Sequence, residues 1–223
     1  MRMRKKKHLE ERLEAVKNYL YISNCDDRNF NTAVNIKDYI DLDSWFGVSQ
    51  PVHLEIGCGK GRFAVEYARL NPDINIIAVE KDSNVIVSAC ELAQSENLKN
   101  LKFIKGSAEY LERHLKENSI QRIILNFSCP FPKNKYASHR LTNYTFLEIY
   151  KRLMCDGAEI HQKTDNMHFF EFSLEQFSSS GFALKNVTLD LHNSSFEGNI
   201  ITEYESRFLA LGQPIYRLEA YIK

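Results

Sequence analysis

The chain has 223 residues, of which 43% are hydrophobic and 12% aromatic, so it can bury a substantial core. Its 29 basic and 29 acidic residues balance, so net charge gives no argument for nucleic-acid binding, and such an argument must rest on local patches. No apolar run approaches membrane-spanning length, and the basic start leads into charged residues rather than a signal-peptide core. We therefore expect a soluble, cytoplasmic protein with no membrane association.

Cysteine and histidine usage bears on redox state and metal binding. The five cysteines are scattered and form no C-x-x-C pair, and the seven histidines complete no metal-ligand spacing. An odd, dispersed set of cysteines is typical of free thiols in a reducing compartment. The sequence therefore predicts free cysteines and no bound metal.

Residues 1–50 read as an extension ahead of the main domain. The chain opens with five basic side chains: Arg2, Arg4, Lys5, Lys6 and Lys7. An amphipathic helix is expected over 9–21, then a polar, irregular stretch from Asn24 and a short segment near 36–46 that contains the single tryptophan, Trp45. The basic arm either adds nonspecific attraction for phosphates or is simply a solvated terminus.

Residues 51–223 alternate between apolar runs and helical patterns and predict a single domain. Strands are expected over 52–56, 74–79, 101–104, 120–127, 158–162, 183–191 and 216–222. Helices are expected over 62–70, 83–94, 108–117, 141–154 and 169–179. Apolar strands separated by helices indicate an α/β fold with a mainly parallel sheet covered on both faces.

A glycine-rich turn between the first strand and helix suggests a cofactor site. Glu55 precedes Gly57, Gly59 and Gly61, and the next strand ends at Glu80. Glycines let the backbone approach a ligand closely, and the following helix offers free N–H groups. A carboxylate at the end of the second strand can accept both hydroxyls of a ribose. The turn alone fits any α/β domain, whereas its combination with Glu80 favours a nucleoside cofactor.

The spacing of this turn differs from the dinucleotide fingerprint G-x-G-x-x-G, because the third glycine comes one residue early. The pattern E-x-G-x-G-x-G resembles motif I of the class I S-adenosylmethionine methyltransferases. That resemblance implies a Rossmann-like fold whose sheet has seven strands, the last antiparallel. It places the glycine turn on the methionine part of the cofactor and Glu80 on the ribose. Adenine contacts would come from Ser107 and Ala108, although Ser107 also suits an ordinary helix N-cap.

The loop after the fourth strand, residues 126–140, carries a candidate substrate surface. Its basic residues are Lys133, Lys135, His139 and Arg140, and its aromatics include Phe131 and Tyr136. Cations interleaved with aromatics suit a nucleic acid, with phosphate contacts and base stacking. A solvated loop anchored to the core by its aromatics fits the same composition equally well.

Several short blocks, taken in order, resemble the bacterial tRNA (guanine-N7)-methyltransferase family over nearly the whole chain. They are the basic start at 1–6, P-V-H-L-E-I-G-C-G-K-G at 51–61, N-P at 71–72, V-E-K at 79–81, N-F-S then P-x-P-K within 126–133, T-D at 164–165, T-E-Y-E-S-R-F at 202–208 and G-x-P-I at 212–215. The resemblance implies methyl transfer from S-adenosylmethionine, leaving S-adenosylhomocysteine, to N7 of a guanosine in the tRNA variable loop.

The family resemblance also assigns residues. It adds Asn126 to the cofactor-binding set. It assigns six residues to the tRNA: Lys133, Asp165, Thr202, Glu203, Tyr204 and Glu205. Simpler roles stay open, because Lys133 could be solvated, Asp165 could cap the following helix, and the two glutamates could alternate on an exposed strand face.

Cys129 departs from the family pattern, because it occupies the position of the family's catalytic Asp. Phe131 replaces a tryptophan, and the basic run after Lys133 is thinned. Guanine N7 has a lone pair and no proton, so methyl transfer needs alignment rather than a base. An acid could orient guanine or stabilise the cationic product, and a cysteine accepts poorly unless it is a thiolate. We expect reduced or lost activity with cofactor binding retained.

Three other interpretations stay open. The chain could be a degenerate member that binds cofactor or tRNA without turnover. It could methylate another base or a small molecule. Cys129 could also be a nucleophile towards pyrimidine C6, although the rest of the chain does not resemble such enzymes. The sequence leaves open whether the protein is a monomer or a homodimer.

Overall fold

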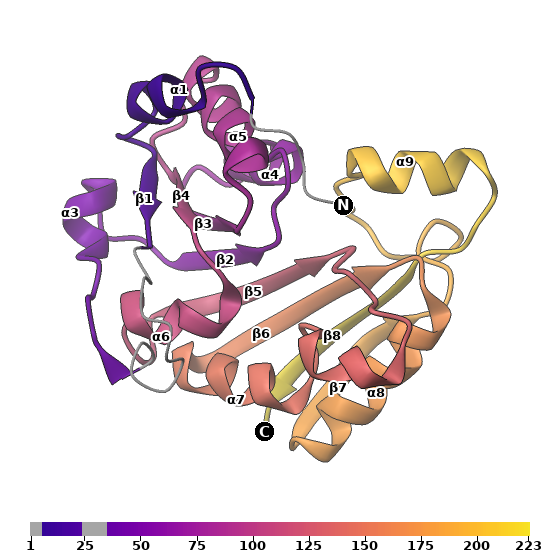
Figure 1. Ribbon diagram of the computed structural model, residues 1–223. Helices are drawn as coiled ribbons and strands as arrows, with labels where there is room; N and C mark the ends of the chain where they lie inside the picture. The colour runs from indigo at the N-terminus through magenta and orange to yellow at the C-terminus, as the bar shows by residue number, and fades with distance from the viewer. Residues whose placement is uncertain (1–5, 24–34) are drawn as a thin grey trace. The chain divides into compact units, whose positions relative to one another are not determined.

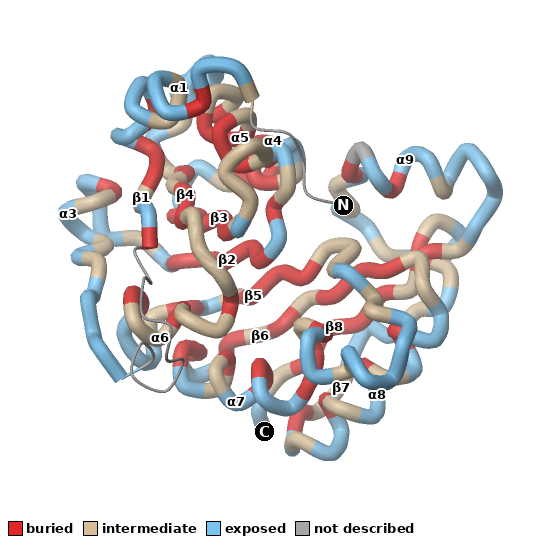
Figure 2. The backbone as a smooth tube through the Cα atoms, in the orientation of Figure 1, coloured by how far each residue is buried: buried red, intermediate tan, exposed pale blue. Residues whose placement is uncertain are grey.

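The computed structural model describes residues 6–23 and 35–223, and the chain folds as two compact units, residues 1–116 and 117–223 (Figure 1). The strands of the first unit are parallel and lie in the order β1 (Leu20–Ile22), β4 (Leu101–Lys105), β3 (Asn75–Glu80) and β2 (Val52–Ile56). Every residue of β2 and five of six in β3 are buried, as expected for parallel strands covered on both faces (Figure 2).

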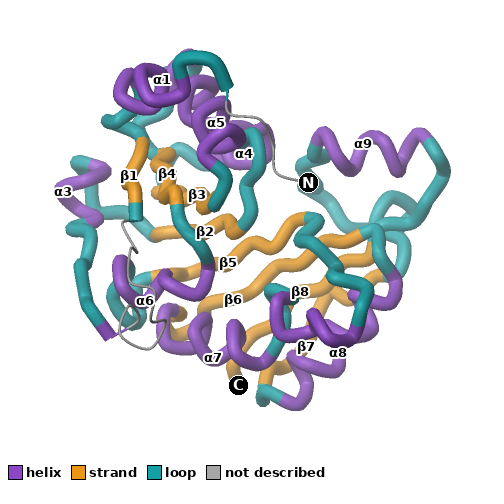
Figure 3. Tube along the Cα trace, viewed as in Figure 1, coloured by secondary structure: helices purple, strands orange, loops and turns teal. Residues whose placement is uncertain are grey.

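Helices of the first unit follow its strands in alternation (Figure 3). They are α1 (Leu9–Ala15), α3 (Leu42–Phe46), α4 (Arg62–Leu70), α5 (Ser83–Ser95) and α6 (Leu111–His114), with a 3₁₀ turn at Ala108–Tyr110 before α6. The α5 helix is capped by Asp82, whose side chain accepts a hydrogen bond from the Asn84 amide over 2.8 Å. Its buried face contributes Ile86, Val87 and Cys90 to the core.

The N-terminal extension differs from the expectation. The helix predicted over 9–21 ends at Ala15, and Leu20–Ile22 form β1 instead. Aromatic and apolar residues here favour pairing with the edge of the sheet: the Tyr19 carbonyl accepts from the Phe103 amide over 2.7 Å. Arg2, Arg4 and Lys5 of the basic arm and the stretch from Asn24 lie outside the described residues.

Strands of the second unit lie in the order β5 (Ile120–Asn126), β6 (Met154–Thr164), β8 (Tyr216–Ile222) and β7 (Phe182–Thr188). β5 and β6 are parallel, and β8 runs antiparallel to both β6 and β7, as predicted for the last strand. The described part of the chain therefore has eight strands rather than seven, because β1 pairs with β4 in the first unit.

The helices of the second unit are α7 (Tyr144–Leu153), α8 (Met167–Ser179) and α9 (Glu203–Ala210), with a 3₁₀ helix at Asn134–His139. α8 packs against β6, β7 and β8 through buried side chains that include Phe169, Phe170 and Phe177. Figure 1 shows α9 set apart from the sheet of its unit, beyond the ends of β5 and β6 and reached by two loop segments.

Three further elements correct the sequence-based expectations. Residues 203–205 start a helix rather than a strand, because Thr202 and Glu205 form a capping box. β6 begins four residues before the expected 158, with Gly157 at φ 75° inside it. The helix expected over 108–117 is only a 3₁₀ turn and the short α6. None of the described helices combines the length and apolarity needed to cross a bilayer.

Candidate active site

The glycine-rich turn after β2 is held by the neighbouring strand. The amides of Gly57 and Cys58 both donate to the Val79 carbonyl, over 2.8 and 3.0 Å. Gly57, Gly59 and Gly61 all have positive φ, a conformation that side chains with a Cβ rarely adopt. Because β2 and β3 pair Ile56 with Val79, the turn lies directly beside the end of β3.

The three glycines serve two purposes. A Cβ on Gly61 would lie 2.6 Å from the Cβ of Ala89 on α5, so close packing of α5 requires glycine there. A Cβ on Gly57 or Gly59 would meet nothing within 4 Å. These two positions therefore border open space, which fits a ligand lying against bare backbone.

Glu80 at the end of β3 is fixed beside this turn. Its Oε1 accepts from the amides of Lys81 and Asp82 over 2.8 and 3.0 Å, and its Oε2 accepts from the Gly59 amide over 3.3 Å. Three backbone donors thus set the orientation of one carboxylate. Glu55 lies in β2 and is only 2% exposed.

The turn after β4 carries the remaining predicted cofactor residues of the first unit. The Gly106 amide donates to the Glu80 carbonyl over 3.1 Å, which places Ser107 and Ala108 next along the same sheet edge. Ser107 occupies the N-cap position of the 3₁₀ turn, but its hydroxyl bonds the Glu109 carboxylate and makes no side-chain cap. Seven of the eight predicted cofactor residues belong to the first unit, and Asn126, the last residue of β5, belongs to the second.

Cys58 lies within the glycine turn but is not a reactive thiol. It is 8% exposed, and burial raises its pKa well above the usual range, with the carboxylates of Glu55 and Glu80 acting in the same direction. The four described cysteines, Cys58, Cys90, Cys129 and Cys155, are all free thiols, and Cys129 is exposed.

The loop after β5 carries Cys129 on an unusual backbone. Phe127 and Phe131 both have positive φ, 49° and 40°, which is uncommon for residues with bulky side chains. Arg140 holds this shape, because its Nε donates to the Pro130 carbonyl over 2.9 Å and its Nη2 to the Phe131 carbonyl over 3.0 Å. The guanidinium also lies 4.4 Å from the centre of the Phe172 ring.

Arg140 is therefore an internal clamp rather than part of a cationic surface. It is 9% exposed, whereas Lys133 and Lys135 on the same loop are exposed. In the sequence these three residues belong to one cationic loop. Nothing in the sequence around Arg140 indicates that its side chain binds two carbonyls of its own loop.

Two predicted substrate residues of the second unit, Asp165 and Tyr204, lie in the same region as Cys129. Burial raises the pKa of Tyr204, and nearby Asp165 and Cys129 act in the same direction while Arg207 opposes them, so these groups lie in one region. The Tyr204 ring lies 5.2 Å from the Phe127 ring, and 46% of Tyr204 is exposed. Asp165 is not the cap of α8, because Asn166 accepts the hydrogen bond from the Phe169 amide over 2.8 Å.

Thr202 and Glu205 form a buried base for α9. The Thr202 hydroxyl accepts from the Glu205 amide over 3.0 Å, and Glu205 Oε2 accepts from Lys163 Nζ over 2.7 Å. Glu205 is completely buried and Thr202 is 9% exposed. The side chain of Glu203 lies outside the described part of the structure. Lys163 had no sequence signal beyond its place before the T-D pair.

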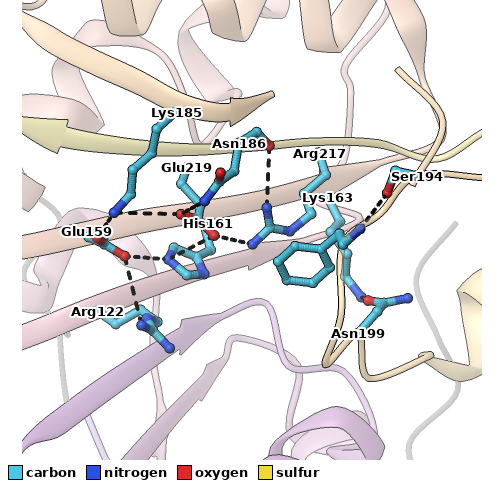
Figure 4. A network of polar contacts seen from close by, with 11 residues as sticks. Arg122, Glu159, His161, Lys163, Lys185, Asn186, Ser194, Asn199, Arg217 and Glu219 are labelled. Carbon is cyan, nitrogen blue, oxygen red and sulfur yellow. Dashed lines mark hydrogen bonds and ion pairs between the residues drawn. The ribbon is translucent and has the colours of Figure 1, made fainter. Parts of the chain in front are cut away.

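One group of potential metal ligands lies on the sheet of the second unit, within the described residues: Glu159, His161 and Glu219. Figure 4 shows that cations already surround its carboxylates. Lys185 bonds Glu159, and Arg217 bonds Glu219. Asn186 donates to Glu219 over 2.7 Å, and Arg122 lies 3.8 Å from Glu159. Both carboxylates, Glu159 and Glu219, are therefore already engaged with basic side chains.

The chain is similar to known methyltransferases over most of its length. A family model described as "Putative methyltransferase" matches residues 49–218. The tRNA (guanine-N(7)-)-methyltransferase of Geobacillus sp. (strain WCH70) is 43% identical over 219 residues, 98% of this chain and 94% of that protein. The protein of that name from Listeria monocytogenes serotype 4b (strain F2365) is 50% identical over 175 residues, 78% of this chain and 82% of that protein.

The fold is shared with solved methyltransferases. A crystal structure described as a SAM dependent methyltransferase from Aquifex aeolicus aligns with a TM-score of 0.56 at 14% identity, covering 98% of this chain and 100% of that one. This likeness confirms the predicted Rossmann-like methyltransferase fold. The extent and identity of the sequence matches confirm the family resemblance: the chain belongs to the tRNA (guanine-N(7)-)-methyltransferase family.

Proposed function

We propose that this protein transfers a methyl group from S-adenosylmethionine to N7 of a guanosine in the variable loop of tRNA. The names of the relatives at 43% and 50% identity support the reaction and the substrate class. The observation that carries the cofactor assignment is the Glu80 carboxylate, fixed by three backbone amides beside the glycine turn.

The residues of the first unit fit this cofactor. Glu80 retains acceptor capacity for ribose hydroxyls, since an ionised carboxylate offers about four acceptor sites. Gly57 and Gly59 border open space on bare backbone, which suits the amino-acid part of the cofactor. Ser107 and Ala108 follow at the same edge and are proposed for the adenine. When bound, S-adenosylmethionine supplies an electrophilic methyl group on its sulfonium.

The residues of the second unit are proposed to bind and orient the guanosine. Its N7 lone pair needs no base, so the protein's task is alignment. Tyr204 offers an exposed ring for stacking, and Asp165 offers a half-buried carboxylate beside it. A carboxylate can accept from the N1–H and the exocyclic amine of guanine. Lys133 is exposed and is proposed to contact a phosphate.

Residues 51–223 would form the methyltransferase domain, with residues 1–50 as an extension whose basic start attracts tRNA. No metal takes part, and the working site is the cytoplasm, in keeping with the free cysteines. The protein would act as a monomer or a homodimer.

A second candidate is favoured by one observation. Cys129, at the position of the family's catalytic carboxylate, is an exposed thiol, and a neutral thiol accepts hydrogen bonds poorly. A protein of this kind would bind cofactor or tRNA with weak turnover or none. The two candidates share the cofactor site and differ only in whether the methyl group reaches the RNA.

One experiment separates these candidates. The protein is incubated with unmodified bulk tRNA and S-adenosylmethionine carrying a radiolabelled methyl group, and the tRNA is digested to nucleosides. Labelled 7-methylguanosine supports the proposal. Binding of S-adenosylhomocysteine without label in the tRNA supports the degenerate member. A different labelled nucleoside contradicts both.

The role of position 129 is tested by substitution in the same assay. Cys129→Asp is expected to raise the rate by about tenfold or more, because a charged acceptor forms stronger hydrogen bonds than a thiol. Cys155→Ala, at another free cysteine of the second unit, is the control and should leave the rate unchanged. A rate that is the same in wild type, Cys129→Ala and Cys129→Asp would place the chemistry elsewhere.

A further inference from the structure

The α9 helix is attached to its unit in an unusual way. Among its described side chains, the only buried one is the charged Glu205. Tyr204 and Leu209 are 46% and 43% exposed, and Phe208 is half-buried. Surface helices normally bury an apolar stripe against the core. Because α9 lacks a fully buried apolar residue among the described ones, polar contacts at its first turn carry much of its attachment, beside the contact of the Tyr204 and Phe127 rings.

Those polar contacts converge on Lys163 at the end of β6. Its Nζ donates to Glu205 over 2.7 Å, to the Asn199 side chain over 3.0 Å and to the Ile200 carbonyl over 2.9 Å. The other oxygen of Glu205 accepts from Asn199 over 2.7 Å. The Lys163 and Glu205 side chains are 8% and 0% exposed. A buried charge whose partner is removed is strongly destabilised, so each of these residues depends on the other.

Lys163 also contacts the start of the loop that carries Cys129. Its carbonyl accepts from the Phe127 amide over 2.8 Å, where Phe127 has the positive φ of 49°. Its Nζ lies 5.9 Å from the centre of the Phe127 ring, which in turn contacts the Tyr204 ring. One residue therefore touches both the loop and the base of α9.

We propose that Lys163 is a positioning residue that locks α9 beside the Cys129 loop and thereby places Tyr204 for the substrate. This assigns Glu205 and Thr202 to the lock itself, as ion-pair partner and helix cap, rather than to direct contact with RNA. The effect on the substrate rests on the proposed function. The attachment of α9 by Lys163 does not rest on it, because Lys163 and Glu205 contact each other without any substrate.

The lock is tested by a cycle of three variants: Lys163→Met, Glu205→Gln and the two together. Lys163→Met removes the ammonium group from Oε2 of the buried Glu205, whose Oε1 keeps His192 Nε2 at 3.3 Å, and Glu205→Gln removes the carboxylate that Lys163 Nζ contacts. The amide introduced at 205 can still cap the helix, since Glu and Gln both serve at that position. The double variant buries no unpaired charge and should recover part of the loss.

Limited trypsin digestion reports the lock without any substrate. Arg207 is exposed on α9 and followed by Phe208, so release of the helix should speed cleavage at this bond. We expect trypsin to cut each single variant there about tenfold faster than wild type. The rate for the double variant should lie between that of wild type and those of the single variants. Lys151→Met is the control, because it breaks a surface ion pair with Glu148 on α7 and should not alter cleavage.

Kinetics then test positioning. The single variants should raise KM for tRNA and lower kcat about tenfold while the dissociation constant of S-adenosylhomocysteine stays at the wild-type value. The proposal would be overturned if the single variants were cleaved at Arg207 no faster than Lys151→Met. It would also be overturned if they lost cofactor binding together with activity. If Lys163→Met does not fold, Glu205→Gln and the double variant give the same comparison. Absence of methylation by wild type would count against the proposed function and leave the digestion result unaffected.

Discussion

The Gly59 amide donates to Oε2 of Glu80 over 3.3 Å, while Oε1 of the same carboxylate is held by the amides of Lys81 and Asp82. One side chain thus ties the glycine turn after β2 to the end of β3. The bond from Gly59 is the longest of the three, so Oε2 is the oxygen best placed to exchange it for a ligand hydroxyl. Glu80 therefore acts both as a brace for the turn and as a proposed ribose acceptor.

Removing the Glu80 carboxylate should weaken cofactor binding. For Glu80→Ala we expect the dissociation constant of S-adenosylhomocysteine to rise by about 10- to 100-fold, the equivalent of about 1.5–3 kcal/mol for hydrogen bonds to a charged group. Isothermal titration calorimetry measures this directly. Glu66→Gln, at an exposed pair with Arg69 on α4, is the control and should bind normally. Equal affinities in the two variants would remove Glu80 from the cofactor site.

Alanine at each glycine of the turn should separate packing from ligand access. Gly61→Ala is expected to lower stability by about 2–5 kcal/mol, because the new Cβ would overlap Ala89 and positive φ adds strain. Gly59→Ala should cost only about 1–2 kcal/mol from strain but weaken S-adenosylhomocysteine binding at least tenfold. Urea unfolding and calorimetry measure the two effects.

Gly157 provides the matched control for these substitutions. It has φ 75°, and a Cβ added there would meet nothing within 4 Å, as at Gly59, but it lies in β6 of the second unit. Gly157→Ala should therefore show the same loss of stability as Gly59→Ala and unchanged cofactor binding. If Gly157→Ala also weakened binding, the effect at Gly59 would reflect strain rather than ligand contact.

The proposed cofactor residues of the first unit can be picked out from the sequence because each lies at or just after the end of a strand. The turn at 57–61 and Glu80 follow from strand ends and glycine spacing, and β2 and α4 have the predicted bounds. Local patterns of this kind can be recognised without knowledge of any tertiary contact. The N-terminal extension was less predictable, since β1 depends on pairing with β4, which lies far along the chain.

The residues that shape the second unit were not predictable in the same way. Arg140 clamps carbonyls of Pro130 and Phe131, and Lys163 pairs with Glu205 forty-two residues later. A charged residue in sequence has the same appearance whether it ends in solvent or in a buried pair. Glu205 was assigned to RNA by resemblance alone, and only its complete burial reveals the ion pair with Lys163.

Arg140→Lys should test the loop clamp. Lysine keeps the charge but loses the planar fork that reaches both carbonyls and stacks on Phe172. We expect kcat/KM for tRNA to fall about tenfold or more, because the hydrogen bonds that shape the loop would be weakened by about 1.5–3 kcal/mol. Binding of S-adenosylhomocysteine should not change. Steady-state kinetics with tRNA and calorimetry with S-adenosylhomocysteine give the two values.

Lys133→Ala should behave differently, because Lys133 is exposed and proposed to contact phosphate. Its loss should weaken tRNA binding and reduce the slope of log K against log salt by about one. Filter binding at several salt concentrations measures the slope. Arg140→Lys should leave the slope unchanged, and a reduced slope in that variant would show that Arg140 meets phosphate rather than the loop carbonyls.

Acid should destabilise the second unit through His161 and Glu159, which bond over 2.8 Å on the face of β6. Burial lowers the pKa of His161 from 6.5 to about 4, and the charge of Arg122 acts in the same direction. Between pH 6.5 and about 4, His161 binds a proton in the unfolded chain but not in the folded chain, so the free energy of unfolding falls as the pH falls. Burial tends to raise the pKa of Glu159, but hydrogen bonds from Lys185 and His161 outweigh it and set it at about 2, from 4.5.

His161 and Glu159 therefore act in successive pH windows. The Glu159 contribution is complete above pH 4.5 and disappears as the pH falls towards 2, whereas the His161 contribution is already changing between pH 6.5 and 4. Lowering the pH from 7.5 to 5 should thus cost about 1–2 kcal/mol through His161 alone. Urea unfolding at the two pH values measures this loss in the free energy of unfolding. In His161→Gln the loss between pH 7.5 and 5 should be smaller by the His161 contribution. His168→Gln, at an exposed pair with Glu171, should keep the wild-type pH dependence. A wild-type pH dependence in His161→Gln would show that the acid sensitivity arises from other groups.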